Sequence, residues 1–278
     1  MSEKAPSGEP LGSANSITFL GTAGDLLVAS RHLRNSGGIV ITSGSSQIHL
    51  DPGPGALARA LQCRINSRDT NILLVSHHHF NHSAGIPELI AGMTLNGLDK
   101  RGIMLAHSSM KDSISSYEKS LLDNVLFTES GTHLNESGVH IKTTPVKGHE
   151  GMGFIVQTNS MSIGYTSDTE YSQKLADEMR DCTLLVVNCQ NPPGEKEKGR
   201  MNVDDAIHLV QEASPKLAVF THFGIKMLDK DHLEMARTIQ KASGVQTLLA
   251  KDGLSIDPLN YSAHARQKNL HGFVSVTR

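Results

Sequence analysis

The 278-residue sequence lacks tryptophan and has few aromatic residues, four Tyr and seven Phe. Any hydrophobic core must therefore be built mainly from aliphatic and methionine side chains. An excess of charge of one sign is also absent, because 26 Lys and Arg residues face 28 Asp and Glu. This balance excludes a general coat for nucleic acid. No run approaches the roughly 18 apolar residues of a membrane span, and the first residues lack an apolar signal core, so we expect a cytoplasmic protein without a membrane partner.

Cysteine is scarce as well, with three residues in the chain. A small and odd number does not suit the disulfide framework of a secreted protein, so we expect Cys63, Cys182 and Cys189 to be free thiols. Histidine, in contrast, is abundant. The chain has 15 histidines, more than Tyr and Phe together. Where these histidines lie along the predicted elements is therefore the main functional question.

The pattern of apolar residues predicts an α/β domain over residues 17–278, after a polar leader of residues 1–16 that we expect to be disordered. Short apolar or β-branched runs predict strands at 17–20, 38–42, 47–50, 71–75, 139–145, 153–158, 162–167, 183–188, 217–221 and 245–250. Helical spacing predicts helices at 83–94, 170–179, 202–212 and 231–243.

These elements fall into two similar halves, residues 17–110 and 135–278, which we expect to pack as two sheets. The first four strands are expected to form one meandering sheet, and a turn at residues 44–46 joins the middle two. In the second half, Asp204 and Asp205 favour the N-terminus of a helix, and Gly244 favours the end of the last helix. Residues 111–136 give no clear prediction.

A dense group of histidines follows the predicted strand 71–75, in the run Ser-His-His-His-Phe-Asn-His of residues 76–82. Residues two apart on an extended backbone project to the same side, so His77 and His79 can bind one metal ion together. His82 lies near a helix start and can turn toward a neighbouring ion. Imidazole suits zinc, iron, manganese and cobalt alike, so residue type does not choose the metal. Taken alone, the run is also compatible with a surface cluster of histidines.

Other residues with metal-ligand chemistry lie at or just after the ends of predicted strands. Asp51 follows the strand 47–50, His149 follows the strand 139–145, Asp168 follows the strand 162–167, and His222 follows the strand 217–221. Loops gather where strands end, and binding sites are built there. The distribution favours a joint site over a surface cluster.

The order His77, His79, Asn81, His82, His149, Asp168, His222 resembles the metallo-β-lactamase fold superfamily, whose hallmark is HxHxDH followed by a distant His, an Asp and a final His. The resemblance covers residues 17 to about 255 and implies a four-layer αββα sandwich. The segments FLGTAG, LDPGPGAL, SDT and THFG resemble the ribonuclease Z-like phosphodiesterase branch and its uncharacterised prokaryotic relatives.

The resemblance also implies roles for these residues. His77, His79 and His149 would hold one divalent ion, while His82, His222 and position 81 would hold a second and Asp168 would bridge the two. Zinc is the expected metal, with manganese or iron as alternatives. Two such ions lower the pKa of a bridging water from about 15.7 toward neutrality and stabilise charge on the attacked group. Asp51 would orient a ligand histidine, or it is simply a turn former.

Position 81 departs from the family pattern because Asn81 stands where the hallmark has Asp. The family's catalytic carboxylates would be at positions 81 and 168, and an amide can neither supply negative charge nor accept a proton. We therefore expect a weak second metal site. The change fits a natural variant with altered metal choice, a metal-binding sensor that has lost catalysis, or an engineered protein.

The resemblance also bears on the substrate. Ribonuclease Z carries an arm for transfer RNA between the third histidine and the bridging Asp, but here only 19 positions separate His149 from Asp168. We therefore expect a small phosphodiester, such as a cyclic nucleotide or short oligonucleotide, and no large RNA. Hydrolysis of a lactone, lactam or thioester is the alternative. Arg31, Arg34 and Ser36 would hold a phosphate, unless they belong to a solvated loop. The family also implies a homodimer.

Overall fold

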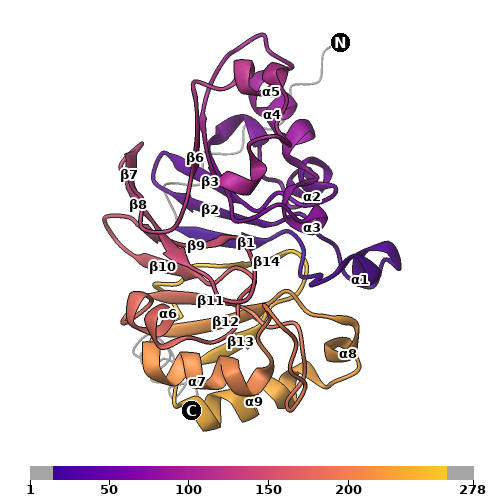
Figure 1. Cartoon of the computed structure of the whole chain (residues 1–278), viewed down its shortest axis with the longest axis vertical. Coiled ribbons are helices and arrows are strands. Elements are labelled where there is room, and N and C mark those ends of the chain that lie inside the picture. The colour runs from indigo at the N-terminus through magenta and orange to yellow at the C-terminus, as the bar shows by residue number, and fades with distance from the viewer. Residues whose placement is uncertain (1–14, 262–278) are drawn as a thin grey trace, which may run out of the picture.

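The computed structural model describes residues 15–261 (Figure 1). Most of the expected disordered leader lies outside this range, but its last residue, Ser16, is the first residue of strand β1. The described chain forms two seven-stranded sheets. The first has the spatial order β14 (Leu254–Ile256), β1 (Ser16–Phe19), β2 (Ile39–Ser43), β3 (Ser46–Leu50), β4 (Thr70–Val75), β5 (Ile103–His107), β6 (Asn124–Thr128).

The second sheet has the order β13 (Thr247–Leu249), β12 (Leu217–Thr221), β11 (Leu184–Asn188), β10 (Ser162–Tyr165), β9 (Met152–Gln157), β8 (Val139–Pro145), β7 (His133–Glu136). The two predicted halves thus become the two sheets, except that β14 returns to pair with β1 in the first sheet. The strands predicted at 139–145 and 217–221 have their predicted bounds.

The predicted meander is wrong for its fourth strand. β1, β2 and β3 are antiparallel, and a tight turn joins β2 to β3. β4, however, runs parallel to β3, because helix α2 (Ala56–Gln62) lies between them in the chain and carries it back across the sheet. A parallel pair needs such a crossover, and its strands then end at one edge of the sheet.

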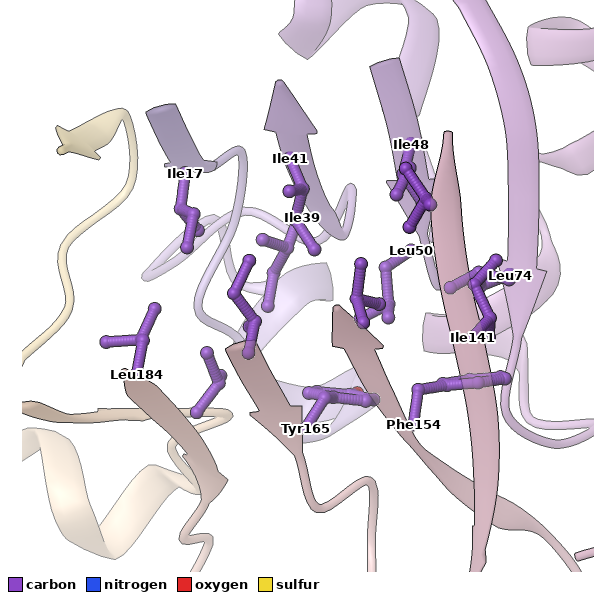
Figure 2. Packing of buried hydrophobic residues seen from close by; sticks show 14 of the residues in the cluster. Ile17, Ile39, Ile41, Ile48, Leu50, Leu74, Ile141, Phe154, Tyr165 and Leu184 are labelled. Atoms are coloured by element: carbon purple, nitrogen blue, oxygen red, sulfur yellow. The ribbon is translucent and has the colours of Figure 1, made fainter. Parts of the chain in front are cut away.

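The core lies between the two sheets, and helices cover both outer faces. Ile72 and Leu74 of β4 join residues such as Phe154 in the central cluster, whereas Leu73 and Val75 face the helices (Figure 2). This alternation is what a strand buried on both faces requires. The arrangement is the predicted four-layer αββα sandwich.

The covering helices are as follows. On the side of the first sheet they are α1 (Leu26–Ser30), α2, α3 (Phe80–Ser83), α4 (Ile86–Thr94) and α5 (Ser116–Leu121), with one-turn 3-10 helices at Ser67–Asp69 and Ser108–Met110. The second half contributes α6 (Gln173–Glu178), α7 (Val203–Ala213), α8 (Ile225–Leu228) and α9 (His232–Ser243). No helix within residues 15–261 is long and apolar enough to cross a membrane.

Several sequence expectations can be compared with these elements. Asp204 and Asp205 do lie in the first turn of α7, and Gly244 ends α9 in a left-handed conformation. The three cysteines are free thiols. The unassigned residues 111–136 contain α5, β6 and β7, and α1, α2, α8, β5 and β14 were not predicted.

Candidate metal centre

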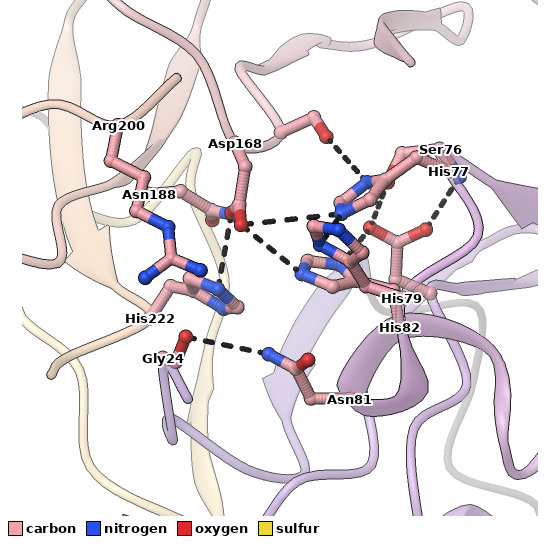
Figure 3. A network of polar contacts seen from close by, with 12 residues as sticks. Gly24, Ser76, His77, His79, Asn81, His82, Asp168, Asn188, Arg200 and His222 are labelled. Carbon is pink, nitrogen blue, oxygen red and sulfur yellow. Dashed lines mark hydrogen bonds and ion pairs between the residues drawn. The ribbon is translucent and has the colours of Figure 1, made fainter. Parts of the chain in front are cut away.

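The histidines singled out in the sequence converge at one edge of the two sheets (Figure 3). His77 and His79 follow β4, and His82 lies on the short helix α3. His149 comes from the turn between β8 and β9, Asp168 follows β10, and His222 follows β12. The parallel strands end at this edge, which is why residues 145 positions apart in the chain meet there.

Three residues at this edge have a left-handed backbone: Asp51 with φ 50°, Ser167 with φ 58° and His222 with φ 64°. Side chains other than glycine rarely adopt this conformation, because Cβ approaches the backbone too closely. Such strain persists only where the surrounding structure enforces it, and it concentrates at functional sites.

The imidazoles lie against one another. His77 Nε2 lies 2.9 Å from His79 Nδ1, and the ring centroids of His77 and His149 are 4.9 Å apart. The ring of His82 lies 4.2 Å from that of His77 and 4.6 Å from that of His222. His77 and His82 are buried, whereas His79 is exposed, so the cluster opens to solvent on the His79 side.

Asp168 lies at the middle of the cluster. Its Oδ1 is 3.1 Å from His222 Nε2, and its Oδ2 is 3.7 Å from His82 Nε2 and 4.0 Å from His77 Nε2. Asn188 Nδ2 donates a hydrogen bond to Oδ1 at 2.9 Å and fixes the carboxylate. One carboxylate thus faces histidines from both halves of the expected metal site.

Asp51 supports the cluster from behind. Its carboxylate accepts hydrogen bonds from the backbone N–H and the hydroxyl of Ser76, and from the hydroxyl of Tyr165 at 2.7 Å. It also lies 2.8 Å from His82 Nδ1. A proton on Nδ1 leaves His82 Nε2 directed at Asp168, so Asp51 orients the histidine in the way that outer carboxylates orient metal ligands.

Three imidazole nitrogens of the cluster lack a hydrogen-bond partner among the described residues, and a bound cation would satisfy them. The Nε2 atoms of His82, His149 and His222 are buried, and none makes a hydrogen bond of regular geometry within residues 15–261, although Asp168 lies near two of them. Ligand atoms of His77, His82 and Asp168 lie within 4.8 Å of one another. Buried polar groups are normally satisfied, so three imidazole nitrogens without such a bond, in a cluster that contains an ionised carboxylate, fit a divalent metal.

The pKa shifts of the clustered residues also favour binding of a cation. Burial lowers the pKa of His82, but the Asp168 and Asp51 carboxylates raise it to about 10. Burial would raise the pKa of Asp168, but His222 and His82 hold it well below the usual range. Burial, together with the neighbouring His82, keeps the pKa of His77 well below its usual value. The pocket therefore stabilises a localised positive charge beside an ionised Asp168.

Asn81 lies at the rim of the cluster on α3. Its Nδ2 is 3.4 Å from the carbonyl oxygen of Gly24, and its own backbone oxygen accepts a hydrogen bond from Ser36 Oγ at 2.8 Å. Figure 3 shows the amide between Gly24 and the histidine cluster. The amide has no bond to Asp168 or to a histidine of the cluster. Position 81 thus adds no negative charge beside His82 and His222.

The three residues expected to hold a phosphate are separated. Ser36 is buried beside Asn81, as its hydrogen bond shows. Arg31 is exposed at the end of α1, and Arg34 lines a different cavity beneath α9. The structure therefore does not bring Arg31, Arg34 and Ser36 together at one cavity, and their role in holding a phosphate stays a prediction.

Sequence reasoning did not single out Arg200, which the structure brings to the centre. Figure 3 shows its guanidinium near Asp168 and His222. Its positive charge also contributes to lowering the pKa of His79, after burial and other neighbours. Residues 191–202, hereafter the Arg200 loop, are predicted from the sequence to be an exposed loop that borders the site, without any one residue singled out. Its nearly balanced charges carried no signal for this position.

Two glycines allow the Arg200 loop to pack against the His149 turn. A Cβ on Gly148 would lie 2.4 Å from Gly199 Cα, and a Cβ on Gly199 would lie 3.0 Å from His149 Cδ2. Gly199 N–H donates to Glu170, and the buried Met201 anchors the loop in the core. Arg200 is therefore held beside the histidines by packing of the backbone.

The fold and the histidine site together define a metallo-β-lactamase-like domain. A family model described as the beta-lactamase superfamily domain matches residues 46–223, and the chain belongs to this family. A relative from Methanocaldococcus jannaschii, the uncharacterised protein MJ1374, is 30% identical over 255 residues, which cover 88% of this chain and 95% of the relative.

Two further comparisons agree with this assignment to the superfamily. Ribonuclease Z of Saccharolobus solfataricus is 23% identical over 275 residues, covering 80% of this chain and 94% of that protein. The crystal structure of the metallo-β-lactamase fold protein YhfI from Bacillus subtilis aligns with a TM-score of 0.76 at 18% identity, over 88% of this chain and 99% of that one. Members of this superfamily include metal-dependent hydrolases, and the chain shares their fold.

Proposed function

We propose that the protein is a zinc-dependent hydrolase of a small phosphodiester. His77, His79 and His149 hold one ion, His82 and His222 hold a second with weak help from Asn81, and Asp168 faces both. Zinc fits the imidazole-rich ligand set, and manganese or iron are the alternatives. Bound ions of this kind activate water and stabilise charge on the attacked phosphoryl group.

The observation that carries the choice of substrate is Arg200. A guanidinium forms two parallel hydrogen bonds to phosphate oxygens and retains its charge at all relevant pH values. A neutral lactone or lactam gains little from such a group, whereas a phosphodiester carries a negative charge in its ground state. In the part of the chain that the structure describes, Arg200 has one ion-pair partner, Glu197 at 3.2 Å. Glu197 is itself exposed, so the guanidinium can exchange that partner for a phosphate.

Two cavities flank the centre and fit the two organic groups of a diester. One, of about 390 Å³, adjoins His149 and is polar, with His107, Ser108 and Glu129 in its wall. The other, of about 400 Å³, adjoins His79 and is more apolar, with Phe80 and Ile114 in its wall. A polar cavity beside His149 and a more apolar cavity beside His79 match a sugar and a base.

The protein's own groups have distinct tasks in this proposal. Asp168, ionised and fixed by Asn188, can accept a hydrogen bond from the attacking water and orient it. Asp51 holds His82 in one orientation through a bond that no substrate disturbs, because Asp51 is buried. Arg200 binds the phosphodiester oxygens and aligns the phosphorus with the centre.

The test compares hydrolysis of bis(p-nitrophenyl) phosphate with hydrolysis of a lactone, a thioester and a chromogenic β-lactam, all with added Zn²⁺ or Mn²⁺. We expect turnover of the phosphodiester only. Arg200→Gln should lower kcat/KM for the phosphodiester by about 10- to 100-fold, the value of a charge-assisted hydrogen bond.

Lys196→Gln is the matched control, because it removes one positive charge from an exposed position of the same loop. It should leave kcat/KM within about twofold, since exposed charges contribute little. Turnover of the lactone or thioester without turnover of the phosphodiester would overturn the proposal.

A further inference from the structure

Another cavity, of about 590 Å³ and distinct from the two described above, lies away from the histidine cluster, between α8, α9 and strand β13. Four basic side chains line it: Arg34, Lys230, Arg237 and Lys251. We propose that this cavity, hereafter the basic cavity, binds a small molecule that carries phosphate groups and an apolar or aromatic part, the chemistry of a nucleoside diphosphate. The inference is independent of the hydrolase function proposed above.

The four cations of the basic cavity form no ion pair with the residues that the structure describes. Seven ion pairs of Lys or Arg occur in residues 15–261, and none of them involves Arg34, Lys230, Arg237 or Lys251. The one carboxylate in the cavity wall, Asp231, accepts hydrogen bonds from the backbone N–H groups of Leu233 and Glu234 at the start of α9. Four positive charges thus face one carboxylate that is already engaged.

Hydrogen bonds between residues far apart in the sequence bring the backbone of Arg34 close to that of Lys251. The backbone and side-chain nitrogens of Asn35 donate to Asp252 at 2.6 and 2.8 Å, and Thr22 donates to the same carboxylate from its N–H and hydroxyl. Arg34 precedes Asn35, and Lys251 precedes Asp252. The Asp252 carboxylate therefore fixes two like charges beside each other, at a cost in repulsion that an anionic ligand offsets.

The rest of the wall suits the organic part of such a ligand. Leu228 and Leu249 pack against the cluster under the helices, are only partly buried and give the wall an apolar part. His232 also lines the cavity, and its buried Nδ1 has no hydrogen-bond partner within residues 15–261. An apolar surface with a few converging polar groups is the usual composition of a small-molecule site.

The basic cavity is separate from the metal centre but adjoins the backbone that forms it. The ring of His232 packs on Phe223 at a centroid distance of 4.8 Å, and Phe223 follows His222 in the chain. None of the clustered histidines lines the basic cavity. A long polyanion would need basic residues spread along a face, whereas these four converge on one concavity, which favours a small ligand.

The test is isothermal titration calorimetry at low salt with ADP, pyrophosphate and adenosine. We expect ADP to bind, and Arg34→Gln and Arg237→Gln each to weaken its binding by about tenfold. Lys241→Gln, an exposed position of α9 outside the cavity wall, should leave binding unchanged. Tighter binding of ADP than of pyrophosphate supports a nucleoside phosphate. Equal binding of both supports the phosphate site but assigns it to inorganic phosphates.

Thermal unfolding of each variant shows whether the fold is intact, and these exposed or half-buried positions should leave it so. The proposal is wrong if neither anion binds. It is also wrong if Arg34→Gln and Arg237→Gln bind ADP as the unchanged chain does, or if Arg200→Gln alone abolishes binding, because that result places the ligand at the metal centre.

Discussion

Replacing Asn81 by Asp is the most informative single change at the metal centre. The two side chains have nearly the same shape, and the backbone at this position is fixed by the hydrogen bond from Ser36 to the Asn81 carbonyl. A Cβ on Gly53 would lie 2.2 Å from the same carbonyl oxygen, so the surrounding chain leaves no room for a shift. The substitution therefore changes charge with little change in structure.

The expected gain in affinity for the second ion follows from two opposing effects. A unit charge about 4 Å from another contributes about 4 kcal/mol at the effective dielectric of a protein surface, and a divalent ion doubles the attraction. Removing the carboxylate from water costs several kcal/mol of this. We expect a net gain of at least about 1.4 kcal/mol, a tenfold tighter second ion. Without added metal, loss of the bond from the amide to Gly24 should lower the free energy of unfolding by about 1 kcal/mol.

The assay is zinc content per chain by mass spectrometry, together with affinity from competition with a chromophoric chelator. The unchanged chain should hold fewer than two tightly bound ions, and Asn81→Asp should hold two and hydrolyse the phosphodiester faster. Asn159→Asp, an exposed position of the same charge change, is the control. Equal zinc content and affinity in the unchanged chain and in Asn81→Asp would refute the reasoning.

Three further predictions concern stability and reactivity. Burial lowers the pKa of His49 from 6.5 to about 4, so between these pH values the unfolded chain binds more protons than the folded chain. The free energy of unfolding therefore falls by up to about 3 kcal/mol as the pH drops through this window. His49→Gln should reduce this dependence on pH, measured by denaturant titration. Burial raises the pKa of Cys182 to about 12 and also raises that of the Cys189 thiol, so a thiol reagent at pH 8 should modify only Cys63 in the folded protein. Asp51→Asn should weaken zinc binding by about 10- to 100-fold without touching a ligand atom.

Each of these has a control. His78→Gln removes an exposed histidine and should leave the acid slope unchanged. Denaturant should expose all three thiols to the reagent, and fast modification of two or more thiols in the folded protein would contradict the burial argument. Asp99→Asn removes a half-exposed carboxylate, so a similar loss of zinc in Asp99→Asn and Asp51→Asn would show that Asp51 has no special role.

The sequence predicted those parts of the site that depend on local spacing. His77, His79 and His82 follow one strand and one short helix, so their proximity needs only local geometry. Asp168 and His222 were found because each follows an apolar strand. The sheets bring such strand ends together.

The parts that could not be predicted depend on contacts between loops. Arg200 reaches the centre because Gly148 and Gly199 touch, and no periodicity indicates that contact. Arg34 was predicted to hold a phosphate with Ser36, but Arg34 lines the basic cavity whereas Ser36 binds Asn81. The residue between them, Asn35, is held by Asp252, 217 positions away, and no local pattern indicates that contact. A crossover through α2 likewise made β4 parallel to β3, because short apolar runs carry no information on strand direction.

The central claim is that His77, His79, His149, His82, His222 and Asp168 form a centre for divalent metal ions. Anomalous diffraction at the zinc edge, from crystals grown with zinc, tests it most directly because it locates each ion. The account predicts a strong peak among His77, His79, His149 and Asp168, and a weaker peak beside His82 and His222. Zinc found only elsewhere, for example at the exposed pair His133 and His140, would contradict it.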